Sequence, residues 1–228
     1  MILITRPKDK AFILESKLSK YGYECYVESL SEIKIQKKNI LFNKNYVYLI
    51  TSPRTANCII NYQKKNLETK FLVIGLSTCN KLKQAGFKNV IYGAQDSDDM
   101  IRFLKKSSIK HINYLTGTVR NNNLPTEISK MGISLKEDII YVTNFRRNFS
   151  KKCISLIKSH KISRVLIYSK ANAQHFIDLI DRANIKKDSK SLVFVCLSKK
   201  IAEVLGTNGY SAHYCSIPTE SSLIKKLT

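Results

Sequence analysis

Short, nearly continuous apolar runs alternate along the chain with longer amphipathic segments. The runs have the length of strands, whereas the segments between them place apolar residues at helical spacing. We expect strands at Ile2–Thr5, Glu24–Val27, Tyr46–Ile50, Phe71–Ile74, Asn89–Tyr92, His111–Leu115, Asp138–Val142, Arg164–Tyr168, Leu192–Cys196 and Ala212–Cys215. We expect helices at Lys8–Tyr21, Thr55–Lys64, Cys79–Ala85, Ser97–Lys105, Leu124–Met131, Phe149–His160, Ala173–Asp181 and Lys200–Thr207. Because the strands are apolar on both faces, the pattern predicts an α/β fold with mainly parallel, buried sheets.

The chain also contains an internal repeat. Three pairs of segments resemble each other: Leu49–Ala56 and Leu166–Ala173, Phe71–Thr78 and Leu192–Lys199, and Leu3–Arg6 and Leu115–Thr118. In the first pair Ser52 and Ser169 occupy the same position. The repeat predicts two similar three-layer α/β domains with a cleft between them.

Two polar segments are candidate connections between these domains, residues 31–44 and 144–148. Two crossings imply a discontinuous first domain. We place domain 1 at residues 1–35 and 146–228, domain 2 at 38–142, and the hinge connectors at 33–38 and 141–146. We expect Ile33–Ile35 and Tyr141–Phe145 to run side by side as a two-stranded connector.

The stretch from Tyr48 to Ala56 is a buried strand end that turns directly into a helix. The hydroxyls of Thr51 and Ser52 can accept hydrogen bonds from the first free N–H groups of that helix, and Pro53 suits its first turn. Arg54 adds a cation beside the positive helix end, so the corner can hold a carboxylate or a phosphate. The alternative is a helix cap without a ligand.

Further hydroxyls follow other strands of the predicted sheets. The full set is Thr5, Thr51, Ser52, Ser77, Thr78, Thr116, Thr118, Ser169 and Ser198. Ligands of open α/β sheets bind outside the carboxyl ends of the strands, so these hydroxyls predict a site for a polyanion. Arg6, Arg54 and Arg120 follow strand ends and could add charge, or they could be solvated surface residues.

Tyr141 ends a predicted strand at the proposed hinge, in the sequence Asp138-Ile-Ile-Tyr-Val-Thr143. A phenol at that position could donate a proton to a bound ligand. A half-buried strand tyrosine without a chemical role is the alternative.

Composition and charge narrow the function classes. The net charge of +22 attracts anions of any kind, although the abundance of Lys, Ile and Asn together also indicates a coding bias. The six cysteines form no C-x-x-C pair and the four histidines have no metal-ligand spacing, so we expect free thiols and no metal. No glycine-rich nucleotide motif is present. No signal peptide precedes the first strand, and no apolar run reaches about 18 residues, which predicts a cytoplasmic protein.

The chain resembles the uroporphyrinogen-III synthase family over nearly its whole length. The matching pieces occur in order: Ile2–Pro7 with Ala11, Ile50–Arg54, Val73–Thr78 with Leu82 and Gly86, Tyr114–Gly117 with Arg120 and Leu124-Pro125, Gly132, Tyr141–Thr143, Ile167–Ser169, Leu197–Ala202, Gly209 and Pro218-Thr219. The piece that contains Tyr114–Gly117 and Arg120 departs from the family, which usually has an arginine at the position of Asn121. The last domain has Leu197–Ile201 where some members have a Gly-x-Thr-Thr turn.

The resemblance implies two α/β domains, a two-stranded connector and a cleft. It implies an enzyme that cyclises hydroxymethylbilane, a linear tetrapyrrole with eight carboxylates, to uroporphyrinogen III with loss of water and inversion of ring D. No cofactor is implied. Tyr141 matches the family's functional tyrosine, and the implied substrate contacts are Thr5, Arg6, Thr51, Ser52, Arg54, Thr78, Thr116, Gly117, Arg120, Ser169 and Ser198.

The implied partner is the small-molecule substrate, with a transient hand-off from the enzyme that forms the bilane. We expect a monomer that binds neither nucleic acid nor membrane. Two alternatives stay open: a basic α/β module that binds nucleic acid through its charge, and a degenerate homologue that binds tetrapyrrole without turnover.

Overall fold

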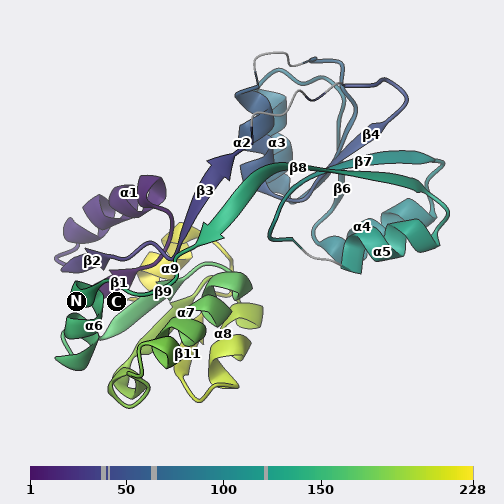
Figure 1. The fold of residues 1–228 in the computed structure, drawn as a ribbon. Helices are drawn as coiled ribbons and strands as arrows, with labels where there is room; N and C mark the ends of the chain where they lie inside the picture. Colours follow the sequence, from purple (N-terminus) through teal and green to yellow (C-terminus); the bar gives the residue numbers. More distant parts are fainter. Residues whose placement is uncertain (37–39, 41, 63–65, 121–122, 228) are drawn as a thin grey trace. The chain divides into compact units, whose positions relative to one another are not determined.

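A computed structural model of the chain describes residues 1–228 except 37–39, 41, 63–65, 121–122 and 228 (Figure 1). The chain forms two compact units. Unit 1 comprises Met1–Ile33 and Asn144–Thr228, and unit 2 comprises Lys34–Thr143. The chain therefore passes between the units twice, within strand β3 (Ser31–Ile35) and within strand β8 (Ser134–Phe145).

The two crossing strands are hydrogen-bonded to each other. The N–H of Gln36 donates to the carbonyl of Ile140 (2.9 Å), and the N–H of Arg146 donates to the carbonyl of Leu30 (3.0 Å). Residue numbers rise along one strand as they fall along the other, so the pair is antiparallel. The predicted two-stranded connector is thus present, formed by β3 and β8.

Unit 1 is built on a five-stranded parallel sheet in the order β11-β10-β9-β1-β2. Its strands are β1 (Ile2–Ile4), β2 (Cys25–Val27), β9 (Arg164–Ile167), β10 (Val193–Cys196) and β11 (Ser211–Tyr214). Its helices are α1 (Lys8–Ser19), α6 (Lys151–Lys158), α7 (Lys170–Arg182), α8 (Lys199–Gly206), α9 (Glu220–Lys225) and the 3₁₀ helix η1 (Asp188–Ser191).

Both faces of this sheet are covered because successive strand residues point to opposite faces. Leu3, Val165 and Phe194 pack with residues of α6, α7 and α8. Ile4 and Leu166 pack on the other face, against α1 and α9. The strands are accordingly apolar without alternation, which explains why the sequence pattern indicated them so clearly.

Unit 2 has a six-stranded sheet in the order β3-β8-β7-β4-β5-β6. Its remaining strands are β4 (Val47–Ile50), β5 (Phe71–Ile74), β6 (Val90–Ala94) and β7 (His111–Gly117), and its helices are α2 (Pro53–Ile60), α3 (Leu76–Gln84), α4 (Ser97–Lys105) and α5 (Asn123–Lys130). Strands β8, β7, β4, β5 and β6 pair in parallel. Leu49, Leu72 and Tyr114 pack with α4 and α5, and Figure 1 shows α2 and α3 on the other side of the sheet.

The two sheets share one topology, as the internal repeat predicted. The order β11-β10-β9-β1-β2 of unit 1 corresponds to β6-β5-β4-β7-β8 of unit 2. In each unit the direction in which successive strands are added to the sheet reverses between two central strands. These strands are β9 and β1 in unit 1 and β4 and β7 in unit 2. Ligands of open α/β sheets bind outside the carboxyl ends of strands at such a switch point. Each unit therefore has its own candidate ligand-binding edge.

The predicted elements differ from the observed ones mainly at helix starts. The helix predicted from Ala173 begins at Lys170, because the side chain of Ser169 accepts from the N–H of Asn172 and caps it. Helix α9 was not predicted, since its six residues are too few to show a helical period. The first half of β8 was missed as well, because residues 134–137 are mostly polar.

Candidate functional site

Unit 2 holds Tyr141 against the glycine that ends the neighbouring strand. Tyr141 of β8 pairs with Gly117 of β7, and the register shifts between Thr116 and Gly117. A Cβ atom at position 117 would lie 2.2 Å from Cε2 of the Tyr141 ring, so only glycine leaves room for it. Tyr141 is 4% exposed. The ring is therefore held in one place by the backbone of β7.

An arginine from the next βα corner lies over the same ring. The guanidinium carbon of Arg54 is 5.7 Å from the centre of the Tyr141 ring, within cation–π range. Helix α2 begins here because Oγ of Ser52 accepts from the N–H of Arg54 (3.2 Å) and Pro53 occupies the first turn. The predicted cap is confirmed. A phenol and a cation thus meet where β4 and β7 end. The expectation that Tyr141 ends its own strand is wrong, because β8 continues past it to Phe145.

The predicted hydroxyl residues of unit 2 differ in how far they are exposed to solvent. Oγ1 of Thr51 lies 2.9 Å from the hydroxyl of Tyr114, which links β4 to β7 across the switch point. Thr78 and Thr116 are 1% and 3% exposed, so their hydroxyls lie inside the unit. Thr51 and Ser52 are partly exposed, and Ser77 and Thr118 are exposed, so these four hydroxyls can meet a ligand in this conformation.

Arg120 follows β7 and forms an ion pair with Glu137 of β8. Its Nε atom lies 2.8 Å from Oε2 of Glu137, although the direction is not that of a hydrogen bond. The cation is therefore already compensated by a neighbouring carboxylate. Asn121, which replaces the family arginine, lies outside the described residues.

The hydroxyl residues of unit 1 have different local roles. Thr5 is fully buried, and its hydroxyl donates to the carbonyl of Leu166 (2.6 Å), which joins β1 to β9. Ser169 caps α7. Ser198 stands at the corresponding position of α8 but makes no side-chain cap bond.

Arg6 belongs to a cluster with Lys17, Tyr168 and Glu220, hereafter the Arg6 cluster. Its guanidinium carbon lies 4.4 Å from the centre of the Tyr168 ring. Its Nη1 lies 2.6 Å from Oε2 of Glu220, and Nζ of Lys17 lies 2.6 Å from Oε1 of the same carboxylate. Each unit thus places an arginine over a tyrosine, Arg6 over Tyr168 at the switch point of unit 1 and Arg54 over Tyr141 of β8, one strand away from the switch point of unit 2.

The surroundings of the Arg6 cluster shift two pKa values. Burial raises the pKa of the Tyr168 phenol well above its ordinary value, and the Arg6 cation only partly opposes this. Partial burial also raises the pKa of Glu220, but the hydrogen bonds and charges of Lys17 and Arg6 outweigh it, so this pKa lies below its ordinary value. At neutral pH the phenol is protonated and the carboxyl group is ionised.

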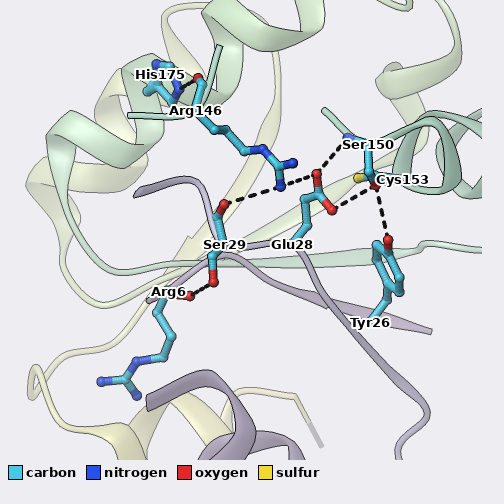
Figure 2. A network of polar contacts seen from close by, with 8 residues as sticks. All are labelled: Arg6, Tyr26, Glu28, Ser29, Arg146, Ser150, Cys153 and His175. Carbon is cyan, nitrogen blue, oxygen red and sulfur yellow. Dashed lines mark hydrogen bonds and ion pairs between the residues drawn. The ribbon is translucent and has the colours of Figure 1, made fainter. Parts of the chain in front are cut away.

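A second polar network anchors both connector strands to unit 1 (Figure 2). Glu28, 3% exposed, precedes β3, and Arg146 follows β8. Oε1 of Glu28 lies 2.5 Å from Nη1 of Arg146 and accepts from the backbone N–H of Ser150 (2.8 Å), while Oε2 accepts from the Ser150 hydroxyl (2.9 Å). Ser150 in turn caps α6.

This network, hereafter the Glu28 anchor, extends in two directions. The ring Nε2 of His175 lies 2.8 Å from the carbonyl of Arg146, so the ring donates there, and burial lowers the pKa of His175. The hydroxyl of Ser29 donates to the carbonyl of Arg6 (2.8 Å). In Figure 2 the Arg6 guanidinium points away from the anchor, so the anchor holds the backbone of Arg6 and does not contact its cation.

Sequence reasoning missed Tyr168, Glu220 and the Glu28 anchor. Tyr168 had a detectable signal, because it precedes Ser169 as Thr51 precedes Ser52 in the repeat. Glu220 and the Glu28 anchor had no detectable signal in the sequence, because the residues that contact each other there are far apart along the chain. Arg6, for example, is 214 residues from Glu220.

Two absences hold for the residues that the structure describes. Among them, no group of three or more His, Cys, Asp or Glu side chains is placed to hold a metal ion. In the same described ranges, no helix is both long and apolar enough to cross a bilayer. All six cysteines are free thiols.

The fold and its two edges define a class of protein, an α/β protein of two repeated units with arginine, tyrosine and hydroxyl groups at the switch points. The chain belongs to the uroporphyrinogen-III synthase family (HemD), whose sequence profile matches residues 14–225.

Individual relatives are distant. An uncharacterised protein of Rickettsia prowazekii is 24% identical and aligns over 99% of this chain and 97% of its own length. A protein of Methanocaldococcus jannaschii that carries the name uroporphyrinogen-III synthase only provisionally is 26% identical over 90% of this chain and 89% of its own.

Solved structures share the fold at still lower identity. The uroporphyrinogen-III synthetase of Helicobacter pylori superposes with a TM-score of 0.66 at 13% identity, over 99% of this chain and 97% of that one. A mutant uroporphyrinogen III synthase of Thermus thermophilus also gives 0.66, at 11% identity, over 100% and 96%.

The contact between Gly117 and Tyr141 makes a first prediction. Gly117→Ala forces the ring to move, and such overpacking costs about 1–3 kcal/mol of unfolding free energy. The displaced phenol should also lower the rate of any reaction in which it takes part. Chemical denaturation and a rate assay measure both effects.

Gly206→Ala is the matched control, because no atom lies within 4 Å of a Cβ at that helical position. It should be neutral or stabilising. Unchanged stability and turnover in Gly117→Ala would show that the ring moves aside without cost.

Proposed function

We propose that the protein is a uroporphyrinogen-III synthase, which cyclises hydroxymethylbilane to uroporphyrinogen III with loss of water and inversion of ring D. Membership of the family supports the reaction class. The observation that carries the proposal is the position of Tyr141, fixed by Gly117 and covered by Arg54. A phenol held in one orientation next to a cation suits an acid that acts on an anionic substrate.

The proposed chemistry begins at the terminal hydroxymethyl group of the bilane. Tyr141 donates a proton to the hydroxyl as the C–O bond breaks, so the group leaves as water and ring A becomes an electrophilic azafulvene. Ring D attacks the methylene group of ring A through its substituted α-carbon, which gives a spiro intermediate. The bond from that carbon to the bridge of ring C then breaks, the bridge joins the other α-carbon of ring D, and the proton lost from that carbon balances the one that Tyr141 donated. The substrate supplies both leaving group and nucleophile, so the proposal requires neither metal nor organic cofactor.

The eight carboxylates of the substrate need cations and free donors. Arg54, Thr51 and Ser52 offer these at the edge of unit 2, and Arg6, Ser169 and Ser198 offer them at the edge of unit 1. Helix N-termini add free N–H groups at both edges. Holding the chain so that rings A and D meet is a positioning task, which can supply much of the rate. We take the working form to be a cytoplasmic monomer.

Product analysis tests the proposal. Hydroxymethylbilane is generated in situ, the protein is added, and the oxidised products are separated into uroporphyrin isomers I and III. We expect isomer III in excess over the isomer I that forms without the protein. Isomer I alone from folded protein would exclude the synthase, and binding of the octacarboxylate would then favour the non-catalytic homologue.

A further inference from the structure

The Arg6 cluster already contains a bound carboxylate, and it belongs to the protein itself. Both oxygens of Glu220 are paired, Oε2 with Arg6 and Oε1 with Lys17, each at 2.6 Å. This distance is at the short end of charge-assisted hydrogen bonds. The cluster lies where β1 and β9 end, at the switch point of unit 1. An internal carboxylate thus occupies a place where ligands of such sheets bind.

The cluster retains capacity for another anion. Arg6 and Lys17 carry two positive charges and Glu220 one negative charge. The Nε atom of Arg6 and the hydroxyl of Tyr168 are both buried, and neither makes a well-aligned hydrogen bond within the described structure, although the Arg6 side chain lies within reach of that hydroxyl. Buried donors without an acceptor are rare in native proteins and call for a physical reason. A carboxylate that reaches the stacked Arg6 and Tyr168 would satisfy them.

The relative exposure of the side chains indicates which group moves. The Arg6 side chain is 15% exposed, whereas those of Glu220 and Lys17 are 29% and 51% exposed. A carboxylate at Nε of Arg6 would share one guanidinium with Glu220, whose Oε2 lies 2.6 Å from Nη1, and the two negative charges repel each other. Glu220 stands in the first turn of α9, a six-residue helix near the end of the chain, and can turn its side chain toward water.

We propose that Glu220 is an internal latch, which occupies a site for one acetate or propionate carboxylate of the substrate and leaves when that carboxylate binds Arg6, Lys17 and the Tyr168 hydroxyl. The identity of the ligand rests on the proposed function, whereas the displacement of Glu220 does not. The latch keeps the buried arginine compensated when no substrate is bound, and it rejects anions that bind Arg6 less well than Glu220 does.

The apparent affinity for substrate equals the affinity of the open form multiplied by the fraction of molecules in which the latch is open. Partly exposed ion pairs are weak, so removing the Glu220 charge should tighten ligand binding by about fivefold. Tyr168→Phe should weaken binding severalfold, because it removes a donor that only the ligand satisfies.

The experiment measures binding of uroporphyrin I, a stable octacarboxylate that is not turned over, by the change in its fluorescence. Glu220→Gln is compared with Glu203→Gln, which removes the same charge from an exposed position on α8 of unit 1. Binding about fivefold tighter in Glu220→Gln than in Glu203→Gln supports the latch. Equal or weaker binding overturns it.

Two further measurements keep the result decisive. If Glu220→Gln does not fold, as judged by circular dichroism, Glu220→Asp replaces it; the shorter side chain cannot reach both cations, and tighter binding is again expected. The isomer assay is run in parallel on the wild-type protein. If the wild-type protein forms no isomer III but the variant binds uroporphyrin I more tightly, the synthase is rejected and the latch is supported. If the wild-type protein forms isomer III but the variant binds uroporphyrin I no more tightly, the latch is rejected and the synthase is supported.

Discussion

Tyr141→Phe is expected to lower the rate of isomer III formation by about 100-fold, the lower end of what general acid catalysis contributes. The substitution keeps the ring, so the contacts with Gly117 and Arg54 remain and only the hydroxyl is lost. Binding of uroporphyrin I should change little, because the cations and helix N-termini that hold carboxylates are untouched. The loss should therefore appear in kcat and not in KM.

Tyr210→Phe is the matched control. This tyrosine is buried in unit 1, whereas Tyr141 belongs to unit 2, and its hydroxyl lies 3.1 Å from that of Ser189. Losing that hydrogen bond should cost about 1 kcal/mol of stability and leave turnover unchanged. If Tyr141→Phe keeps the wild-type rate, Tyr141 is not the acid and its phenol serves packing alone.

Glu28→Ala is expected to destabilise unit 1 by about 3 kcal/mol. It removes the carboxylate that compensates Arg146 and accepts two hydrogen bonds from Ser150. We expect the lower end of the range for a broken buried pair, because the Arg146 side chain is 35% exposed and water can partly solvate the remaining charge. Urea denaturation gives the loss, and amide hydrogen exchange across α6 locates it.

Glu127→Ala is the comparison for an exposed ion pair, since Glu127 pairs only with Lys130 one turn along α5. It should shift the denaturation midpoint little. Glu28→Gln should fall between the two variants, because its amide oxygen still accepts from Ser150. A loss in Glu28→Ala no larger than in Glu127→Ala would mean that the Glu28 anchor adds nothing to unit 1.

The sequence predicted the sheets better than their edges. Phe71–Ile74 was located to the residue, because a strand covered on both faces must be apolar throughout. The internal repeat likewise predicted the shared strand order. The start of β8 was missed because residues 134–137 are mostly polar, and strand pairing with β7 is what holds them extended.

The candidate site was predictable to the extent that it follows strand ends. The corner at Ser52–Arg54 could be derived from cap chemistry, and the structure has that cap. The burial of Thr78 and Thr116 could not be derived from the sequence. A hydroxyl that follows a strand faces inward or outward according to the turn that comes after it. The Arg6–Glu220 pair joins opposite ends of the chain, which no local pattern reveals.

The shared strand order has a consequence for how the protein is made. Unit 2 takes its strands β4 to β8 from one continuous stretch, which is complete once residue 143 has been synthesised. Unit 1 begins with β1 and β2 but needs β9, β10 and β11, which come last. At about 5–20 residues per second, the remaining chain takes roughly 4–17 s to appear. During that interval the apolar strand Ile2–Ile4 has no partner on its β9 side, so this strand edge stays open until the last third of the chain has folded onto it.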